Sequence, residues 1–120
     1  MLDVCFVHLK PVRSEKADFA TVVPCRMADL LGSEVRLHVI YMGTINEGKL
    51  QRKGIRTYRY DGVLAGNLLT RYIGFTKFVA DVLRCQDVDI VQNVWVHLGL
   101  FPLKAAGLIA GVPLVARIAG

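Results

Sequence analysis

The feature that most restricts the fold of this sequence is an alternation between short apolar runs and longer segments with helical spacing. Five runs have the composition of β-strands, at residues 3–8, 34–41, 55–60, 88–96 and 112–118. Between them, residues 17–31, 67–84 and 100–110 place apolar side chains three and four positions apart, as amphipathic helices do. Strands that alternate with helices form parallel sheets wound by right-handed crossovers. The sequence therefore predicts a Rossmann-like, doubly wound α/β fold with a mostly parallel sheet.

The polarity of each run predicts its place in that sheet. The first, fourth and fifth runs are almost continuously apolar, which is typical of strands covered on both faces. The third run carries Arg56 and Arg59, and charged side chains are typical of an edge strand. The second run alternates, so His38 falls on its less apolar face, where we interpret it as a structural residue. These features predict the strand order 3-2-1-4-5.

Local signals predict where the elements begin and end. The first helix contains Pro24, so it either kinks there or begins near Thr21 as its N-cap, and it stops at Gly32. Residues 10–16 predict a polar loop, and the turn residues within 42–54 leave little room for a crossover helix. Since the sequence stops just after an apolar strand, we expect a domain truncated at its carboxyl end.

Composition restricts the function classes. The chain of 120 residues suits one domain, and its 53% hydrophobic content predicts a packed core and not a disordered chain. Three cysteines without a C-x-x-C pair, Cys5, Cys25 and Cys85, predict reduced core residues of a cytoplasmic protein. The apolar stretch 98–118 is interrupted by prolines and charges, so we expect no membrane span.

In a doubly wound sheet, ligands bind beyond the carboxyl ends of the strands, where the strand order reverses. Here that point lies between the first and fourth strands. The polar and aromatic residues that follow them could give a phosphorylated or sugar ligand a cation, hydrogen-bond donors and a stacking plane. The predicted substrate-binding residues are His8, Lys10, Lys16, Asn93, Trp95 and His97.

Motifs for several other chemistries are missing from the sequence. It has neither the G-x-G-x-x-G of dinucleotide-binding folds nor the G-x-x-x-x-G-K-[ST] of P-loop proteins, which argues against a simple dehydrogenase or NTPase. No serine has the context of a nucleophile elbow, and no histidine has a partner at metal-ligand spacing, so we predict no metal site.

Positive charge is concentrated in one segment. Residues 49–59 carry five bases and no acid, and the chain as a whole has 15 Lys and Arg against 10 Asp and Glu. Without a recognition motif we expect no nucleic-acid partner. Peripheral contact with an anionic bilayer, helped by Arg71, Lys77 and Arg84 of the long helix, stands beside the simpler interpretation of a solvated surface.

Two stretches resemble a known family. Residues 89–95 (DIVQNVW), followed by a small-residue helix and then 111–120 (GVPLVARIAG), resemble the D-[IV]-V-H-x-H and G-x-P-[LV]-V-x-x-x-H-G regions of family 4 glycosyltransferases. Residues 30–35 (LLGSEV) are similar to the family's L-x-x-x-G-H-E-V step. The resemblance implies the amino-terminal, acceptor-side domain of a two-domain GT-B enzyme. It also implies a nucleotide-sugar donor as co-substrate, a sugar or lipid acceptor, and no cofactor or metal.

The sequence departs from the family at three places. The family's Gly-Gly aligns with Glu15-Lys16, its H-x-H pair with Gln92-x-Val94, and its last histidine with Ala119. No catalytic residue is therefore carried over, and the 120-residue chain alone is expected to be inactive because the family's E-x7-E motif would lie downstream. A non-catalytic or flavodoxin-like nucleotide-binding module is the alternative.

Overall fold

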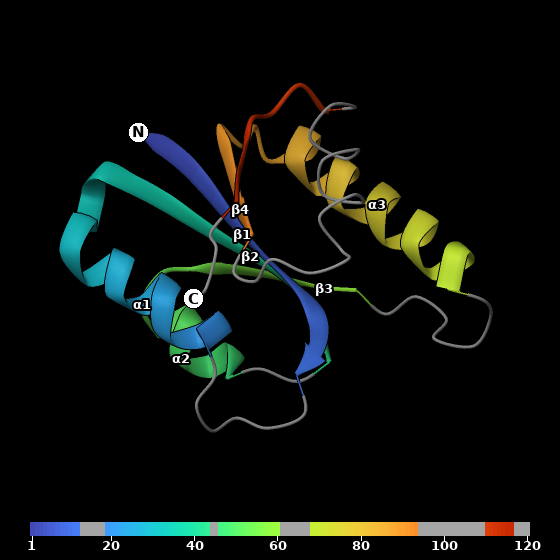
Figure 1. Cartoon of the computed structure of the whole chain (residues 1–120). Coiled ribbons are helices and arrows are strands. Elements are labelled where there is room, and N and C mark those ends of the chain that lie inside the picture. The colour runs from blue at the N-terminus through green and yellow to red at the C-terminus, as the bar shows by residue number, and fades with distance from the viewer. Residues whose placement is uncertain (13–18, 44–45, 61–67, 94–109, 117–120) are drawn as a thin grey trace.

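A parallel sheet forms the centre of the molecule. The computed structural model describes residues 1–12, 19–43, 46–60, 68–93 and 110–116. In this part of the chain the strands are β1 (Leu2–Val12), β2 (Val35–Gly43), β3 (Arg56–Arg59), β4 (Ile90–Asn93) and β5 (Leu114–Ala116). They pair in the order β3-β2-β1-β4-β5, and every neighbouring pair is parallel (Figure 1). The predicted fold class and strand order are confirmed.

Helices cover both faces of the sheet. The helical elements are α1 (Phe19–Leu31), the 3-10 turn η1 (Gly32–Glu34), α2 (Glu47–Arg52) and α3 (Leu68–Cys85). Figure 1 shows α1 and α2 on one side of the sheet and α3 on the other. Alternation along β2 explains both layers, because Leu37 and Val39 pack with Cys25 of α1 while Ile40 packs with Val79 of α3.

Two predictions about individual elements are confirmed, one of the two alternatives for the first helix is excluded, and one boundary is wrong. The third strand is the edge strand β3, and α1 ends before Gly32, whose φ of +51° suits a residue without a side chain. However, α1 begins at Phe19 with Pro24 inside it, so Thr21 is not its N-cap. Strand β1 also runs on to Val12, with an irregular register after His8, where the sequence predicted a loop.

The helix α2 contradicts the prediction that residues 42–54 leave little room for a crossover helix. This helix is six residues long, and Asn46 caps it by accepting a hydrogen bond from the Lys49 N–H at 3.1 Å. Leu50 on its inner side is fully buried against the sheet, which stabilises a segment too short to be helical alone.

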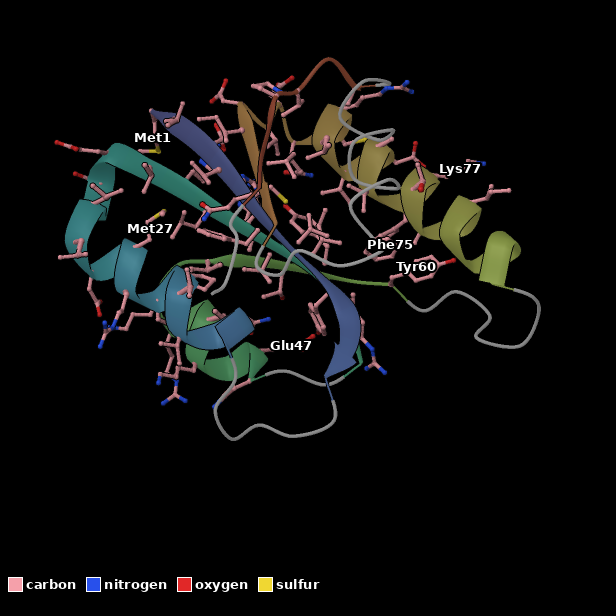
Figure 2. All side chains as sticks on the ribbon, in the orientation of Figure 1. Met1, Met27, Glu47, Tyr60, Phe75 and Lys77 are labelled. Carbon is pink, nitrogen blue, oxygen red and sulfur yellow. The ribbon has the colours of Figure 1, made fainter. Side chains whose placement is uncertain are left out.

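In its described part, the long helix α3 packs on the sheet through a stripe that differs from the predicted one at two positions. Val79, Val82 and Leu83 are buried as expected, whereas Ile73 is 62% exposed. Phe75 takes the core position instead and makes an edge-to-face contact with Tyr60 at 5.4 Å between ring centroids (Figure 2). The predicted helix 100–110 and residues 94–96 of the predicted fourth strand lie outside the described residues, except for the helical Ala110.

Candidate functional site

The predicted ligand-binding site lies at the carboxyl ends of the two neighbouring strands β1 and β4. We call this place the β1–β4 edge. Val7 of β1 pairs with Asn93, the last residue of β4, and the chain order of the strands reverses between these two. His8 follows directly in β1, and Lys10 lies in its irregular last part. The backbone therefore brings His8 and Asn93 to one edge of the sheet, as expected for neighbouring parallel strands.

The side-chain chemistry of this edge stays a prediction. Of the six residues, the structure describes only the backbone for three, His8, Lys10 and Asn93, and the other three, Lys16, Trp95 and His97, lie outside the described residues.

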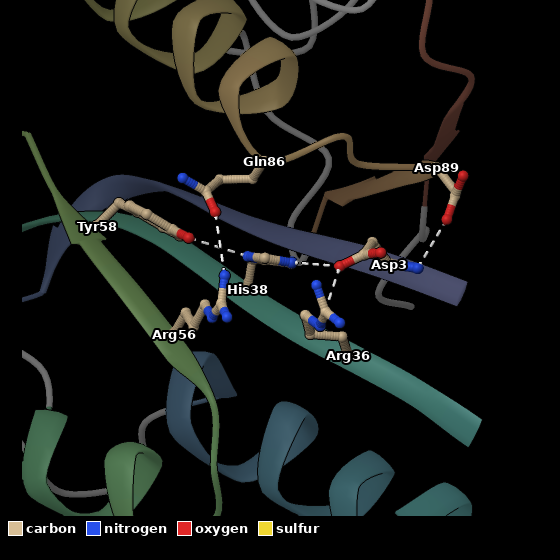
Figure 3. Close-up of polar contacts among 7 residues, drawn as sticks. All are labelled: Asp3, Arg36, His38, Arg56, Tyr58, Gln86 and Asp89. Carbon is tan, nitrogen blue, oxygen red and sulfur yellow. Dashed lines mark hydrogen bonds and ion pairs between the residues drawn. The ribbon is translucent and has the colours of Figure 1, made fainter. Parts of the chain in front are cut away.

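A polar network that the sequence did not predict crosses the sheet under α3 (Figure 3). The fully buried His38 of β2 lies at its centre. Its Nε2 lies 2.9 Å from Asp3 Oδ1 on β1, and its Nδ1 lies 3.0 Å from the Tyr58 hydroxyl on β3. Three adjacent strands are thus joined by side chains as well as by their backbone ladders.

Further groups extend the network at both ends. The Arg36 Nε lies 3.7 Å from the same Asp3 oxygen. The Asp3 N–H donates to Asp89 Oδ2 at 2.8 Å, while the Asp89 N–H donates to the Asp3 carbonyl at 2.9 Å. On the other side, Arg56 donates to Gln86 just after α3 at 3.2 Å.

Burial decides the chemistry of this network. Burial raises the pKa of Tyr58, and the positive charge of the neighbouring Arg56 opposes this shift. His38 has no exposed surface, so it cannot meet a substrate in this arrangement. Asp3, His38 and Tyr58 therefore satisfy one another's hydrogen bonds inside the fold, an arrangement that suits a structural role and not catalysis on a bound ligand.

The cysteines divide between core and surface. Cys5 and Cys25 are buried, as predicted, but Cys85 is exposed, and all three are free thiols. Burial raises the pKa of Cys5, and burial also raises that of Cys25 despite the positive charges of Lys49 and Lys53 nearby. The two buried thiols therefore stay protonated and are poor nucleophiles.

A depression of about 370 Å³ lies at the amino-terminal ends of the strands, opposite the predicted ligand edge. The last part of α1, the turn η1, the first residues of β2 and the segment 53–55 that precedes β3 line it. Its two basic groups already have acidic partners, since Lys53 contacts Asp29 at 2.6 Å and Arg36 contacts Asp3. We assign this depression no ligand, because ligands of doubly wound sheets bind at the carboxyl ends.

The basic segment does not form one surface. Lys49 and Arg52 are exposed on α2, on one side of the sheet. Arg56 instead contacts Gln86 at the end of α3, and Lys77 is exposed on α3, both on the other side (Figure 2).

Among the described residues, no group of three or more His, Cys, Asp and Glu side chains is placed to hold a metal ion. In the same part of the chain, no helix is long and apolar enough to cross a membrane.

No protein-family model and no curated protein sequence matches the chain. Solved structures do match. A glycosyltransferase from Rickettsia africae ESF-5 superposes with a TM-score of 0.69 at 14% identity, over 96% of this chain and 29% of that protein. MurG from Acinetobacter baumannii gives 0.69 at 14% identity, over 98% of this chain and 34% of that protein. The chain therefore has the fold of one domain of these two proteins, a doubly wound parallel α/β sheet.

The chain spans about a third of the length of these two proteins. A C-terminal domain of PF1911 hydrogenase from Pyrococcus furiosus has the same fold at domain size, with a TM-score of 0.63 and 11% identity over 97% of this chain and 89% of that one. At identities this low, similarity establishes the fold and not the reaction.

Proposed function

We propose that the chain is the amino-terminal, acceptor-side domain of a family 4 glycosyltransferase, of the hexosyltransferase type. The observation that carries the proposal is the match to a glycosyltransferase and to MurG over almost the whole chain, at about a third of their lengths. The family-like stretches at 89–95 and 111–120 support it independently. The full protein would move a sugar from a nucleotide-sugar donor to a lipid, polysaccharide or small-molecule acceptor.

The position of the site on the sheet predicts what each domain of the full protein would contribute. The β1–β4 edge presents one wall of a cleft, and a second domain must supply the opposite wall with the donor site and the catalytic carboxylates. A structural match from Anabaena, solved in complex with UDP and glucose, supports a nucleotide-sugar as the donor. The same proposal places the protein in the cytoplasm, with peripheral contact at the inner membrane face.

Activity assays on two lengths of the protein test the proposal. The 120-residue chain alone should transfer no sugar from a panel of radiolabelled nucleotide-sugar donors. The complete reading frame, expressed whole, should contain a second Rossmann unit with an E-x7-E motif and should transfer sugar. Transfer by the short chain, or a stop codon soon after Gly120, would overturn the proposal.

Within this proposal, the six predicted substrate-binding residues contact the acceptor. His97→Ala in the complete enzyme should raise the KM for the acceptor and leave the KM for the donor unchanged. The control is Lys77→Ala, an exposed change on the outer side of α3, which should leave both KM values unchanged. A change at the other described histidine, His38, would not serve, because His38 is buried. A rise only in the donor KM would place His97 on the other side of the cleft.

The hydrogenase domain favours the second candidate, a non-catalytic or flavodoxin-like nucleotide-binding module, because it matches this chain at nearly equal length. Calorimetric titration separates the two functions. A self-sufficient module should bind FMN or a nucleotide as the isolated chain, whereas an acceptor-side domain should bind neither without its second domain.

A further inference from the structure

Apolar side chains are exposed at the end of the sheet where its strands begin. In the described part of the chain, all but two of the exposed large apolar residues lie at the start of β1 or the end of α1, namely Met1, Leu2, Leu30 and Leu31. Met1 is 73% exposed and Leu30 is 83% exposed. A single exposed apolar residue is ordinary, whereas a group of them marks a surface that another molecule covers.

Three of these residues form one surface with Val35. Leu2 is paired with Val35, the first residue of β2. Met1 and Val35 both line the depression of about 370 Å³, and Leu31 directly precedes Gly32, which lines it as well. Figure 2 shows Met1 at this end of the sheet, beside the start of β2. We call this surface the amino-terminal patch (Met1, Leu2, Leu31 and Val35).

An acid and a base flank Val35 in the sequence. Glu34 is exposed, and it makes no ion pair or hydrogen bond with any residue that the structure describes. On the other side, the Arg36 Nε lies 3.7 Å from Asp3 Oδ1, which is too far for a hydrogen bond, and the Arg36 side chain is 45% exposed. A guanidinium has five N–H donors, so Arg36 can bind a second carboxylate and still stay beside Asp3.

We propose that the amino-terminal patch joins two copies of this chain about a two-fold axis that passes near Val35. A two-fold interface requires a surface that is complementary to itself. The order acid, apolar residue, base meets this requirement, because two such segments that run in opposite directions bring Glu34 of each copy to Arg36 of the other. Val35 then faces its own equivalent, and the apolar side chains of the patch cover one another and leave water.

The position of the patch favours a second copy over a second domain of the same protein. Under the proposed function, that domain lies at the β1–β4 edge, at the carboxyl ends of the strands. The patch lies at the opposite ends, because β1 begins at Leu2 and ends at Val12. A dimer through the patch therefore leaves the β1–β4 edge open in both copies, and the inference does not depend on the reaction.

Sedimentation velocity over a wide range of protein concentration tests the dimer. The protein should pass from monomer to dimer as its concentration rises. Leu31→Gln removes a partly exposed apolar side chain from both copies at once, so the dissociation constant of the dimer should rise roughly tenfold. Ile73→Gln is the matched control, because Ile73 is also exposed but lies on α3, and it should leave the dissociation constant unchanged.

Charge reversals test the axis itself. Glu34→Arg and Arg36→Glu should each prevent the dimer, because like charges then face each other at both contacts. An equal mixture of the two variants should form a mixed dimer, since an arginine of one copy then faces a glutamate of the other at both contacts. Asp81→Lys reverses an exposed acid on α3 and should leave the dimer intact.

Three results would overturn the proposal. The wild-type protein stays monomeric at every concentration, Leu31→Gln and Ile73→Gln weaken the dimer equally, or the mixture of charge reversals forms no more dimer than either variant alone. Thermal unfolding shows whether each variant is folded. If Arg36→Glu does not fold beside Asp3, the other two changes decide, because a dimer that neither Glu34→Arg nor Leu31→Gln weakens is not formed through the patch.

Discussion

At the scale of single residues, Gly74 shows how closely α3 approaches the sheet. A methyl group at this position would overlap the Tyr60 hydroxyl, which lies directly beneath it. The usual cost of overpacking is about 1–3 kcal/mol, and alanine gains about 1 kcal/mol of helix propensity over glycine, so Gly74→Ala should destabilise the protein by up to about 2 kcal/mol. Urea denaturation measures the free energy of unfolding.

Two further variants separate overlap from other effects of the Gly74 change. Gly48→Ala in α2 meets only ordinary contacts, so it should be neutral or stabilising. Tyr60→Phe removes the overlapping hydroxyl, and the double variant with Gly74→Ala should regain most of the lost stability. If the double variant is no more stable than Gly74→Ala alone, the hydroxyl is not the cause.

Tyr58 also makes stability depend on alkaline pH. Its pKa is raised in the folded state, mainly by burial, so the folded protein holds the phenol proton more tightly than the unfolded chain does. The stabilisation is fully present below the unfolded pKa of about 10 and is lost as the pH rises through the folded pKa.

Tyr58→Phe tests this sign. Below about pH 10 the variant should be less stable than wild type by about 1–3 kcal/mol, because the buried Nδ1 of His38 loses its partner. Above that pH the difference in unfolding free energy should shrink, since only wild type loses the Tyr58 contribution. A difference that stays constant or grows up to about pH 11 would contradict the raised pKa.

At the scale of elements, α3 owes its place to a few buried positions. Leu83→Ala should cost about 2–5 kcal/mol, because Leu83 is almost fully buried between α3 and the sheet. Ile73→Ala, a matched truncation on the same helix, should change stability by less than about 0.5 kcal/mol, since Ile73 is largely exposed. Equal costs in thermal or urea unfolding would mean that α3 packs through a different face.

The positions of strands in the sheet were predictable from the sequence where a single property, apolarity or charge, dominated a strand. Continuous apolarity placed β1 and β4 inside the sheet, and the charges Arg56 and Arg59 placed β3 at its edge. The same signal predicted an inside position for β5, which is instead the outermost strand next to β4 in the described sheet. The helix α2 was missed because Asn46, its N-cap, is also a turn residue, and six residues are too few for a periodicity. Tertiary burial of Leu50 decides this helix, and a local sequence window contains no trace of that burial.

The candidate site was predictable only in part, for a related reason. The carboxyl-end rule identified the β1–β4 edge, and the pairing of Val7 with Asn93 brings those strand ends together. The network of Asp3, His38 and Tyr58 joins residues 35 and 20 positions apart, which no spacing rule connects. Alternation placed His38 on the correct face of β2, but only the register against β1 and β3 reveals its partners.

At the scale of the whole molecule, the sheet separates the basic side chains into two groups. Lys49 and Arg52 are exposed on the α2 side, while Lys77 and Arg84 are exposed on α3, across the sheet. The field of a charged bilayer fades beyond a Debye length of about 8 Å at physiological salt. The two groups therefore cannot act together on one membrane, and the predicted membrane contact must use one side.

We expect that side to be α2, since Lys49 and Arg52 are both exposed on this one short helix. Each base near an anionic surface contributes about 1 kcal/mol, so Lys49→Ala with Arg52→Ala should lower binding to anionic vesicles by roughly thirtyfold at low salt. The control pair, Lys77→Ala with Arg84→Ala, removes the same charge from the opposite side and should leave binding nearly unchanged. Co-sedimentation with anionic and neutral liposomes measures both. If wild type binds anionic vesicles no better than neutral ones, or if the two pairs lower binding equally, α2 is an ordinary solvated surface.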